Sequence, residues 1–391
     1  MKKNIAILGS TGSIGKQTLE IIKKDKKKFN IVLLSSNSNL KEISKQIKLF
    51  KPKNLIITNP LKFFFLKKKY KKINIFNSYV CFKKIFPKKI DYVMSSISGF
   101  NGLQPTIEII KYTKLIAIAN KESIICGWNF IKNELQKNKT KFIPVDSEHF
   151  SIWSLLSNKS ENVERIFITA SGGPFLNINK RKLKFIKPSA AIKHPRWKMG
   201  KKISVDSATM VNKVFEIIEA KKIFNLEIEK INILSHPDSY VHAIVKFKNG
   251  LTKLLTHDTD MKIPIFNSLY GYPFTKTYPA KLNIKKLNNL NLKFVSTSQF
   301  PVLKIIKYFS FKNDSLLETV LVSANDELVE LFLNNKIGYL DISKKLDTIL
   351  KLKEFKNLRY KKPTNLRQIV ALNKYVRLKT RALCVVSNVN D

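Results

Sequence analysis

The feature that most constrains the fold is a regular alternation of short apolar runs with helix-like stretches over the N-terminal part of the chain. The apolar runs occupy residues 4–9, 29–35, 54–58, 91–97, 114–120 and 141–146. Short, nearly continuous apolar strands separated by helices are typical of a parallel sheet covered by helices. The first run leads into GSTGSIG at 9–15 and then into a helix, which is the opening of a βαβ unit.

Length and composition predict more than one domain. With 391 residues, 44% of them hydrophobic, the chain is too long for one ordinary core. We predict an α/β chain with an N-terminal Rossmann-like domain at 1–150, a central mixed α/β domain at 151–270, a linker at 271–296 and a C-terminal helical bundle domain at 297–391. Within the central part, an Asn-Gly turn between two apolar runs predicts a β-hairpin.

The glycine-rich turn indicates a dinucleotide site. Gly9, Gly12 and Gly15 let the backbone approach a pyrophosphate closely, while the next helix offers free N–H groups. Its place on the first strand of a βαβ series favours this function over that of an ordinary turn. Residues 35–39, at the end of the second strand, lack the carboxylate with which NAD sites bind the ribose 2′-hydroxyl. NADP is therefore the favoured cofactor.

The net charge of +44 is typical of proteins that bind polyanions. Here the lysines are scattered over the whole chain beside abundant Asn, Ile and Phe, which indicates drift in genome composition rather than a selected basic face. Runs such as 23–28 and 67–72 fall in loops or at predicted helix ends, where they are solvated. We predict no nucleic-acid partner. A basic nucleic-acid-binding protein is the non-enzymatic alternative, and it predicts a steep salt dependence of binding.

Cysteine usage and hydropathy predict a cytoplasmic protein. Cys81, Cys126 and Cys384 are odd in number and far apart, which fits neither a disulfide framework nor a zinc site. The N-terminal apolar run is too short for a signal peptide and leads straight into the glycine turn. Because the sequence has no uninterrupted apolar stretch of about 18 residues, we predict no membrane partner.

Two acidic, serine-containing segments, at 144–153 and 203–216, indicate a site for a metal and an anion. Asp146 and Glu148 follow a strand, and in extended chain residues two apart point to the same side. Oxygen ligands suit Mg²⁺ or Mn²⁺ rather than zinc. The structural alternative is a single carboxylate that caps a helix beginning near Ser147.

The second segment is predicted to form one amphipathic helix after Asp206. At about 100° per residue its apolar residues share one face, and Asn212, Lys213 and Glu216 share the opposite arc, free for chemistry. Glu219 lies on that same arc. Spacing alone therefore leaves both Glu216 and Glu219 open as the third metal ligand.

The loop HPRWKMGKK contains His194, Trp197 and Gly200, a combination compatible with a mobile cover that closes over a substrate. An ordinary surface loop containing proline explains the same residues equally well. Four further polar residues lack the spacing of a metal site and are left unassigned: His236, His242, His257 and Asp260.

Six segments in this order resemble the 1-deoxy-D-xylulose 5-phosphate reductoisomerase family. They are GSTGSIG, IANKES (118–123), PVDSEH, SGGPF (171–175), HPRWKMGKKISVDSATMVNK and HPDSYVH (236–242). The resemblance covers nearly the whole chain. It implies an NADPH-dependent conversion of 1-deoxy-D-xylulose 5-phosphate to 2-C-methyl-D-erythritol 4-phosphate in the non-mevalonate isoprenoid pathway, with Mg²⁺ or Mn²⁺. It also implies a homodimer formed through the central domain, which would be catalytic and bind the metal.

The resemblance assigns residues by motif. It implies that the metal is held by Asp146, Glu148 and Glu216, which decides against Glu219. The phosphate of the sugar substrate would be bound by Ser171, Ser207, Asn212 and Lys213. Its backbone oxygens would face Lys121, Ser147, Glu148 and His194, beneath a flap that carries Trp197. Lys121 would assist proton transfer. The cofactor site would be lined by Thr11, Gly12, Ser13, Ile14, Asn39, Asn120, Glu122 and Gly200.

The chain departs from the family pattern at several positions. The usual HPNWSMG has Arg196 and Lys198 here, which add positive charge near an anionic substrate. The usual Gly-Leu after Lys213 is Val214-Phe215, and overpacking there costs about 1 to 3 kcal/mol if the surroundings do not adjust. Because no proposed ligand or phosphate contact is lost, we predict an active enzyme.

The second-strand loop weakens the expected affinity for a 2′-phosphate, because Asn37 and Ser38 replace the usual glycine and basic residue. A different enzyme class, an NADP oxidoreductase without a metal, would keep the glycine turn but would not need Asp146, Glu148 and Glu216. That alternative predicts activity in excess chelator.

Overall fold

The computed structural model describes residues 2–156, 162–176, 178–197, 199–271, 278–279, 281–310 and 314–385. Lys198 and parts of the predicted linker and C-terminal domain lie outside these residues. The chain divides into two units. The first comprises Met1–Ser123, Asn129–Phe150 and Met261–Ala280; the second comprises Ile124–Trp128, Ser151–Asp260 and Lys281–Asp391.

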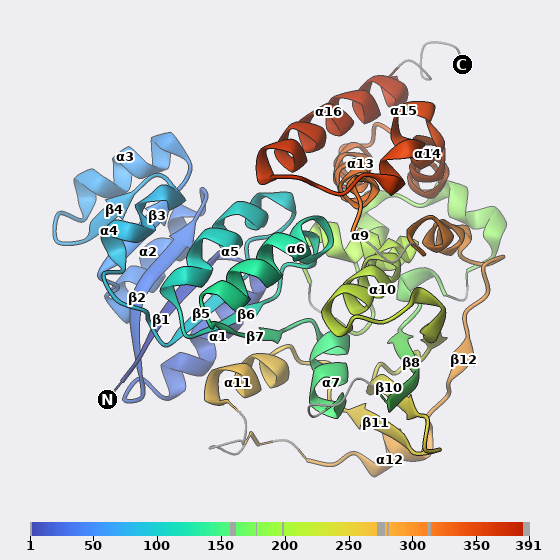
Figure 1. Ribbon diagram of the computed structural model, residues 1–391, viewed down its shortest axis with the longest axis horizontal. Helices are drawn as coiled ribbons and strands as arrows, with labels where there is room; N and C mark the ends of the chain where they lie inside the picture. Colours follow the sequence, from blue (N-terminus) through green and yellow to red (C-terminus); the bar gives the residue numbers. More distant parts are fainter. Residues whose placement is uncertain are drawn as a thin grey trace. The chain divides into compact units, whose positions relative to one another are not determined.

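The first unit contains a seven-stranded parallel sheet of order β4-β3-β2-β1-β5-β6-β7 (Figure 1, blue to green). Its strands are β1 (Lys3–Leu8), β2 (Phe29–Ser36), β3 (Asn54–Ile57), β4 (Asn74–Phe76), β5 (Tyr92–Ser95), β6 (Leu115–Ile118) and β7 (Lys141–Pro144). The six predicted strands and the parallel topology are confirmed. The short β4, which sequence analysis missed, lies at the sheet edge.

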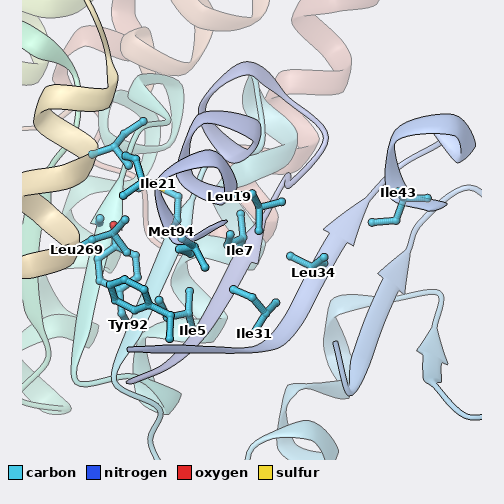
Figure 2. Packing of buried hydrophobic residues seen from close by; sticks show 14 of the residues in the cluster. Ile5, Ile7, Leu19, Ile21, Ile31, Leu34, Ile43, Tyr92, Met94 and Leu269 are labelled. Atoms are coloured by element: carbon cyan, nitrogen blue, oxygen red, sulfur yellow. The ribbon is translucent and has the colours of Figure 1, made fainter. Parts of the chain in front are cut away.

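Most helices of the first unit follow its strands, as βαβ connections require, and the last one comes from far along the chain. They are α1 (Ser13–Lys24), α2 (Leu40–Phe50), α3 (Pro60–Lys69), α4 (Phe82–Ile85), α5 (Leu103–Ile109) and α11 (Lys262–Tyr270). Two more, α6 (Lys121–Lys137) and α7 (Ser147–Leu156), contribute residues to both units. Figure 2 shows the core, in which Ile5 and Ile7 of β1 lie with Leu34, Tyr92 and Met94 from β2 and β5.

Helix α11 returns to this core from far along the chain. Leu269 lies in the same apolar cluster as α1 and β5 (Figure 2). The Tyr92 hydroxyl is hydrogen-bonded to Ser268 at 2.8 Å, and the Tyr270 hydroxyl donates to Asp25 at 2.8 Å. Sequence analysis placed residues 262–270 in the central domain, and this placement is corrected by the packing of α11.

The second unit contains a mixed five-stranded sheet of order β11-β10-β8-β9-β12. Its strands are β8 (Val163–Ala170), β9 (Ile231–Ser235), β10 (Val241–Phe247), β11 (Thr252–Thr256) and β12 (Lys293–Phe294). The predicted Asn-Gly hairpin is confirmed, since β10 and β11 pair antiparallel and Gly250 has a φ of 86°. Strand β12, within the predicted linker, pairs with β9.

The helices of the second unit are mostly C-terminal (Figure 1, orange to red). They are α8 (Pro188–Ala191), α9 (Lys201–Thr209), α10 (Val211–Phe224), α12 (Ile284–Asn288), α13 (Leu316–Leu333), α14 (Tyr339–Lys351), α15 (Lys353–Lys356) and α16 (Leu366–Val385). The helical segments predicted there are present, although Pro301–Phe309 is a 3₁₀ helix. In the described part of the chain, no helix has both the length and the apolar character needed to cross a membrane.

Candidate active site

The turn after β1 requires glycine at two positions, because a side chain there would collide with neighbouring backbone atoms. A Cβ at Gly9, whose φ is 80°, would lie 2.7 Å from the Ser96 carbonyl oxygen. A Cβ at Gly15 would lie 2.5 Å from the Gly9 carbonyl oxygen. Gly12 is the N-cap of α1 and places no side chain over the first turn. The N-terminus of α1 is therefore open to an anion, as a pyrophosphate site requires.

The end of β2 is polar and carries no acid. Thr11 Oγ1 is hydrogen-bonded to Ser36 Oγ at 2.9 Å, which ties the glycine turn to this strand. Asn37 is exposed. Asn39 caps α2 by accepting a hydrogen bond from the Glu42 N–H at 3.1 Å, so its side chain already has a structural role. Residues 35–39 therefore contain no carboxylate that would repel a 2′-phosphate.

Asn120 is a structural residue of the first unit. It is buried and donates to the Ile97 carbonyl and, at 2.8 Å, to the Gly99 carbonyl. Its Oδ1 caps α6 by accepting from the Ser123 N–H at 2.5 Å. These bonds hold the loop after β5. Glu122, also buried, lies in the first turn of α6.

The first acidic segment begins a helix rather than extending β7. Because α7 starts at Ser147, Asp146 and Glu148 do not follow the strand alternation assumed from sequence. The Lys121 ammonium lies 2.9 Å from one Asp146 oxygen, and His149 Nδ1 lies 3.1 Å from the other. Burial opposes charge on Asp146, but Lys121 and His149 outweigh it and hold the pKa of this carboxyl well below its ordinary value. Glu148 accepts a hydrogen bond from the Ser147 hydroxyl at 2.5 Å.

The second acidic segment is two helices instead of the predicted one. Met210 adopts a left-handed conformation with a φ of 65°, and this break separates α9, which contains Ser207, from α10. In α10, Glu216 forms an ion pair with Lys213 and accepts a hydrogen bond from Asn212. The Lys213 ammonium also donates to a backbone carbonyl of β8 at 2.6 Å.

The polar arc of α10 is buried, which corrects the expectation of an open face. Glu216 and Glu219 are each only 1% exposed, and Lys213 is 4% exposed. Burial alone does not decide between the two glutamates. The local partners differ, since Asn212 and Lys213 both bind Glu216.

Ser171, His194 and Trp197 lie together in the second unit. The Gly173 N–H donates to Ser171 Oγ at 3.1 Å, and Ser171 Oγ is hydrogen-bonded to His194 Nε2 at 3.1 Å. His194 Nδ1 accepts from the Trp197 N–H at 2.9 Å, so the ring links the flap to the loop after β8. Burial and then the charge of Lys213 lower the pKa of His194 to about 4. The imidazole is therefore neutral at pH 7.

The donor chemistry of the acidic residues fits a hard divalent cation. Asp146 and Glu148 in the first unit and Glu216 in the second offer only carboxylate oxygens, the ligands that Mg²⁺ and Mn²⁺ prefer. In each unit a lysine ammonium already lies beside an expected ligand, Lys121 at Asp146 and Lys213 at Glu216. These carboxylates therefore lie where the protein stabilises positive charge.

Comparison with known proteins decides the family. Models described as 1-deoxy-D-xylulose 5-phosphate reductoisomerase and its C-terminal domains match residues 5–127, 142–224 and 257–379. The reductoisomerase of Pelagibacter ubique is 57% identical over 388 residues, which cover 98% of this chain and 100% of that protein. The chain belongs to the 1-deoxy-D-xylulose 5-phosphate reductoisomerase family.

Other relatives agree over most of their length. The reductoisomerase of Clostridium tetani is 38% identical and covers 89% of this chain and 92% of its own. The Zymomonas mobilis enzyme solved with NADPH superimposes with a TM-score of 0.86 at 30% identity, covering 98% and 99% of the two chains. A reductoisomerase solved with NADPH, fosmidomycin and magnesium superimposes with a TM-score of 0.92 at 28% identity, covering 99% of each chain. The predicted family, fold class and NADPH- and metal-dependent conversion of 1-deoxy-D-xylulose 5-phosphate are confirmed.

The departures from the reductoisomerase pattern have local partners. The Arg196 guanidinium donates to Asp238 at 2.7 Å, so its added charge is compensated. Phe215 is fully buried, and the Lys202 ammonium lies 5.3 Å from the centre of its ring. Lys202 in turn pairs with Asp206 at 2.9 Å. Phe215 therefore packs beside the ammonium of Lys202, whose charge is balanced by Asp206.

Sequence reasoning missed some residues of this reductoisomerase site. His149 pairs with Asp146, and a signal was available because it lies three residues on, inside PVDSEH. Asp238 pairs with Arg196, and His257 stacks on His242, which contacts Trp197, but no spacing pattern marked Asp238 or His257.

The glycine turn yields a stability prediction. Gly15→Ala is expected to lower the free energy of unfolding of the first unit by about 1 to 3 kcal/mol, because the new Cβ meets backbone that cannot move away. Hydrogen exchange of β1 amides measures this. Lys16→Ala, exposed on the same helix, is the control and should change stability by less than about 0.5 kcal/mol. Equal effects of the two variants would refute the close-contact argument.

His194 yields a pH prediction. Its pKa is lowered from 6.5 to about 4, so the unfolded chain binds the proton more readily than the folded one between these values. The contribution of His194 to stability is therefore present above pH 6.5 and lost as pH falls toward 4. NMR titration, assigned with His194→Gln, should show a midpoint near 4, moving upward in Lys213→Met. A midpoint between 6 and 7 contradicts the burial of this ring.

Proposed function

We propose that this chain carries out the reductoisomerase reaction with NADPH and Mg²⁺ or Mn²⁺, using the residues predicted by motif. Asp146, Glu148 and Glu216 would hold the metal. The observation that carries this assignment is the pairing of Asp146 with Lys121 and of Glu216 with Lys213 inside their own units.

The bound metal ion would polarise the vicinal oxygens of the substrate and stabilise negative charge on them. The residues of this chain would do the remaining work. Ser171, Ser207, Asn212 and Lys213 would bind the phosphate group and fix the orientation of the sugar. Lys121, Ser147 and His194 would face its oxygens, and Lys121 would assist proton transfer while the carbon skeleton rearranges to an aldehyde.

Neutral His194 suits a hydrogen-bonding role. Since its Nδ1 accepts from the Trp197 N–H, the proton lies on Nε2, which faces Ser171. Ser171 is thereby held next to the expected phosphate position. The Trp197 flap would exclude water while hydride from NADPH reduces the aldehyde.

For the cofactor, the open N-terminus of α1 supports pyrophosphate binding at Thr11, Gly12, Ser13 and Ile14. We propose that Asn120 shapes the cofactor site by holding the loop after β5, and not by direct contact with the cofactor, because its side-chain amide already bonds to the protein. Asn39, Glu122 and Gly200 complete the predicted cofactor set.

We also propose a cytoplasmic homodimer, with a phosphorylated sugar as the substrate and with no nucleic-acid or membrane partner. The family resemblance supports the dimer. Sedimentation velocity at micromolar concentration tests it, since a single monomer-sized boundary would oppose dimer formation.

The assignment of the third metal ligand is tested by Glu216→Gln. Oxidation of NADPH, followed by absorbance with 1-deoxy-D-xylulose 5-phosphate and Mn²⁺, should fall by about a hundredfold or more, because a ligand that stabilises transition-state charge is lost. Glu219→Gln is the matched control, equally buried on the same helix, and should retain activity. The opposite ranking would assign Glu219 as the ligand. Full activity of the wild type in excess chelator would favour the metal-free oxidoreductase instead.

Cofactor choice is tested at the end of β2. Asn37→Asp should raise the Kd for NADPH by about tenfold, because a carboxylate would repel the 2′-phosphate. Asn37→Ser, without a charge, is the control. The Kd for NADH should change much less in both variants, and a loss that is equal for the two cofactors would place the 2′-phosphate elsewhere.

A further inference from the structure

The segment 194–197, called the flap segment here, rests on a pair of stacked histidines. The Trp197 ring meets His242 edge-on, with ring centres 6.0 Å apart and planes at 70°. His242 in turn stacks on His257, with centres 3.6 Å apart and planes at 15°. All these residues belong to the second unit. The three rings form a continuous column from the flap segment to the end of β11.

Backbone hydrogen bonds fix the orientation of the histidine pair. The His257 carbonyl oxygen lies 3.0 Å from His242 Nε2, and the Asp258 carbonyl oxygen lies 2.7 Å from His257 Nδ1. Because a carbonyl oxygen can only accept, both rings are held with a proton on the named nitrogen. His242 is 2% exposed and His257 is 8% exposed. The pair is therefore a rigid platform.

His257 is not explained by hydrogen bonding alone. Among the described residues its Nε2 is buried without a hydrogen-bond partner, which is unfavourable for a polar atom. Burial lowers the pKa of His257 and so favours the neutral ring. The face of the His257 ring stacks on His242, and this contact gives the buried ring a structural role.

A second attachment holds the flap segment to the loop between β9 and β10. Arg196 Nε donates to the Pro237 carbonyl at 3.1 Å, and its guanidinium pairs with Asp238 at 2.7 Å. The pair is nearly half exposed, so salt screens it. The two attachments engage adjacent residues, Arg196 and Trp197.

We infer that His257 is a positioning residue for the reductoisomerase reaction: stacked beneath His242, it fixes Trp197 in place, and the Arg196–Asp238 pair holds the same segment. The inference rests on the proposed role of Trp197 as the cover of the substrate. A flap segment that is ordered before binding loses less conformational freedom when the substrate arrives. Removing the platform therefore weakens substrate binding while leaving the groups that perform the chemistry intact.

The test compares His257→Ala with His257→Phe in the full-length enzyme. Both carry Trp128→Phe and Trp153→Phe, so that Trp197 is the only tryptophan. In His257→Ala, the fluorescence anisotropy of Trp197 should fall and the KM for 1-deoxy-D-xylulose 5-phosphate should rise about two- to tenfold, with kcat changed less than twofold. His257→Phe keeps a flat ring, so its Trp197 anisotropy and its KM should both return to the values of the protein that keeps His257.

Several outcomes would overturn the inference. These are an unchanged anisotropy or an unchanged KM in His257→Ala, a fall in kcat alone, and failure of a folded His257→Phe to restore either value. If His257→Ala does not fold, Asp238→Asn, at a partly exposed position, replaces it. In low salt, the anisotropy of Trp197 should be lower in Asp238→Asn than in the protein that keeps Asp238. In high salt, the two proteins should have the same anisotropy. No loss of anisotropy in that variant would also overturn the inference. Failure of the proposed function shows separately, as absent turnover in the unaltered protein.

Discussion

Ion pairs through the interior of the second unit set the position of α10 and, with it, the residues proposed to bind the substrate phosphate and the metal. The Lys222 ammonium, on α10, lies 2.5 Å from Asp314, which precedes α13, and 2.7 Å from Glu318 in the first turn of α13. Burial disfavours charge on Lys222, but Glu318 and Asp314 outweigh it and raise its pKa. A buried pair of this kind adds little net stability, yet removing one partner leaves an uncompensated charge and costs about 3 to 5 kcal/mol. The pair therefore specifies one register of α10, which carries Asn212, Lys213 and Glu216.

Much of the first unit was predictable because its signals are local. Each central strand is a continuous apolar run, and the glycines that permit the turn after β1 are visible in the sequence. Strand β4 was missed because three residues at a sheet edge need little apolar character. The return of α11 was not predictable, since its apolar residues fit any core, and only long-range contacts such as Tyr92 with Ser268 select this one.

The motifs supplied the candidate site residues, but not the surroundings in which the structure places them. Periodicity gave α10 the right polar arc, but it could not reveal the left-handed Met210 or the burial of Glu216 and Glu219. A hydrophobic period reports which residues share a helix face, not a break in the backbone or the burial of that face. The stacked histidines were missed for a related reason: His242 lies on β10 and His257 directly follows β11, so their contact depends on the register of the β10–β11 hairpin.

The packing of α11 determines when the N-terminal unit can be completed during synthesis. Its core includes residues near 5 and residues near 269, so a ribosome must have made more than two thirds of the chain before the last apolar face is covered. At about 5 to 20 residues per second, synthesis from β7 to the end of α11 leaves this face of the sheet uncovered for roughly 6 to 25 seconds. During that interval the nascent chain presents an apolar surface suited to chaperones or to misassembly. The N-terminal unit of this enzyme thus matures late, although it is encoded first.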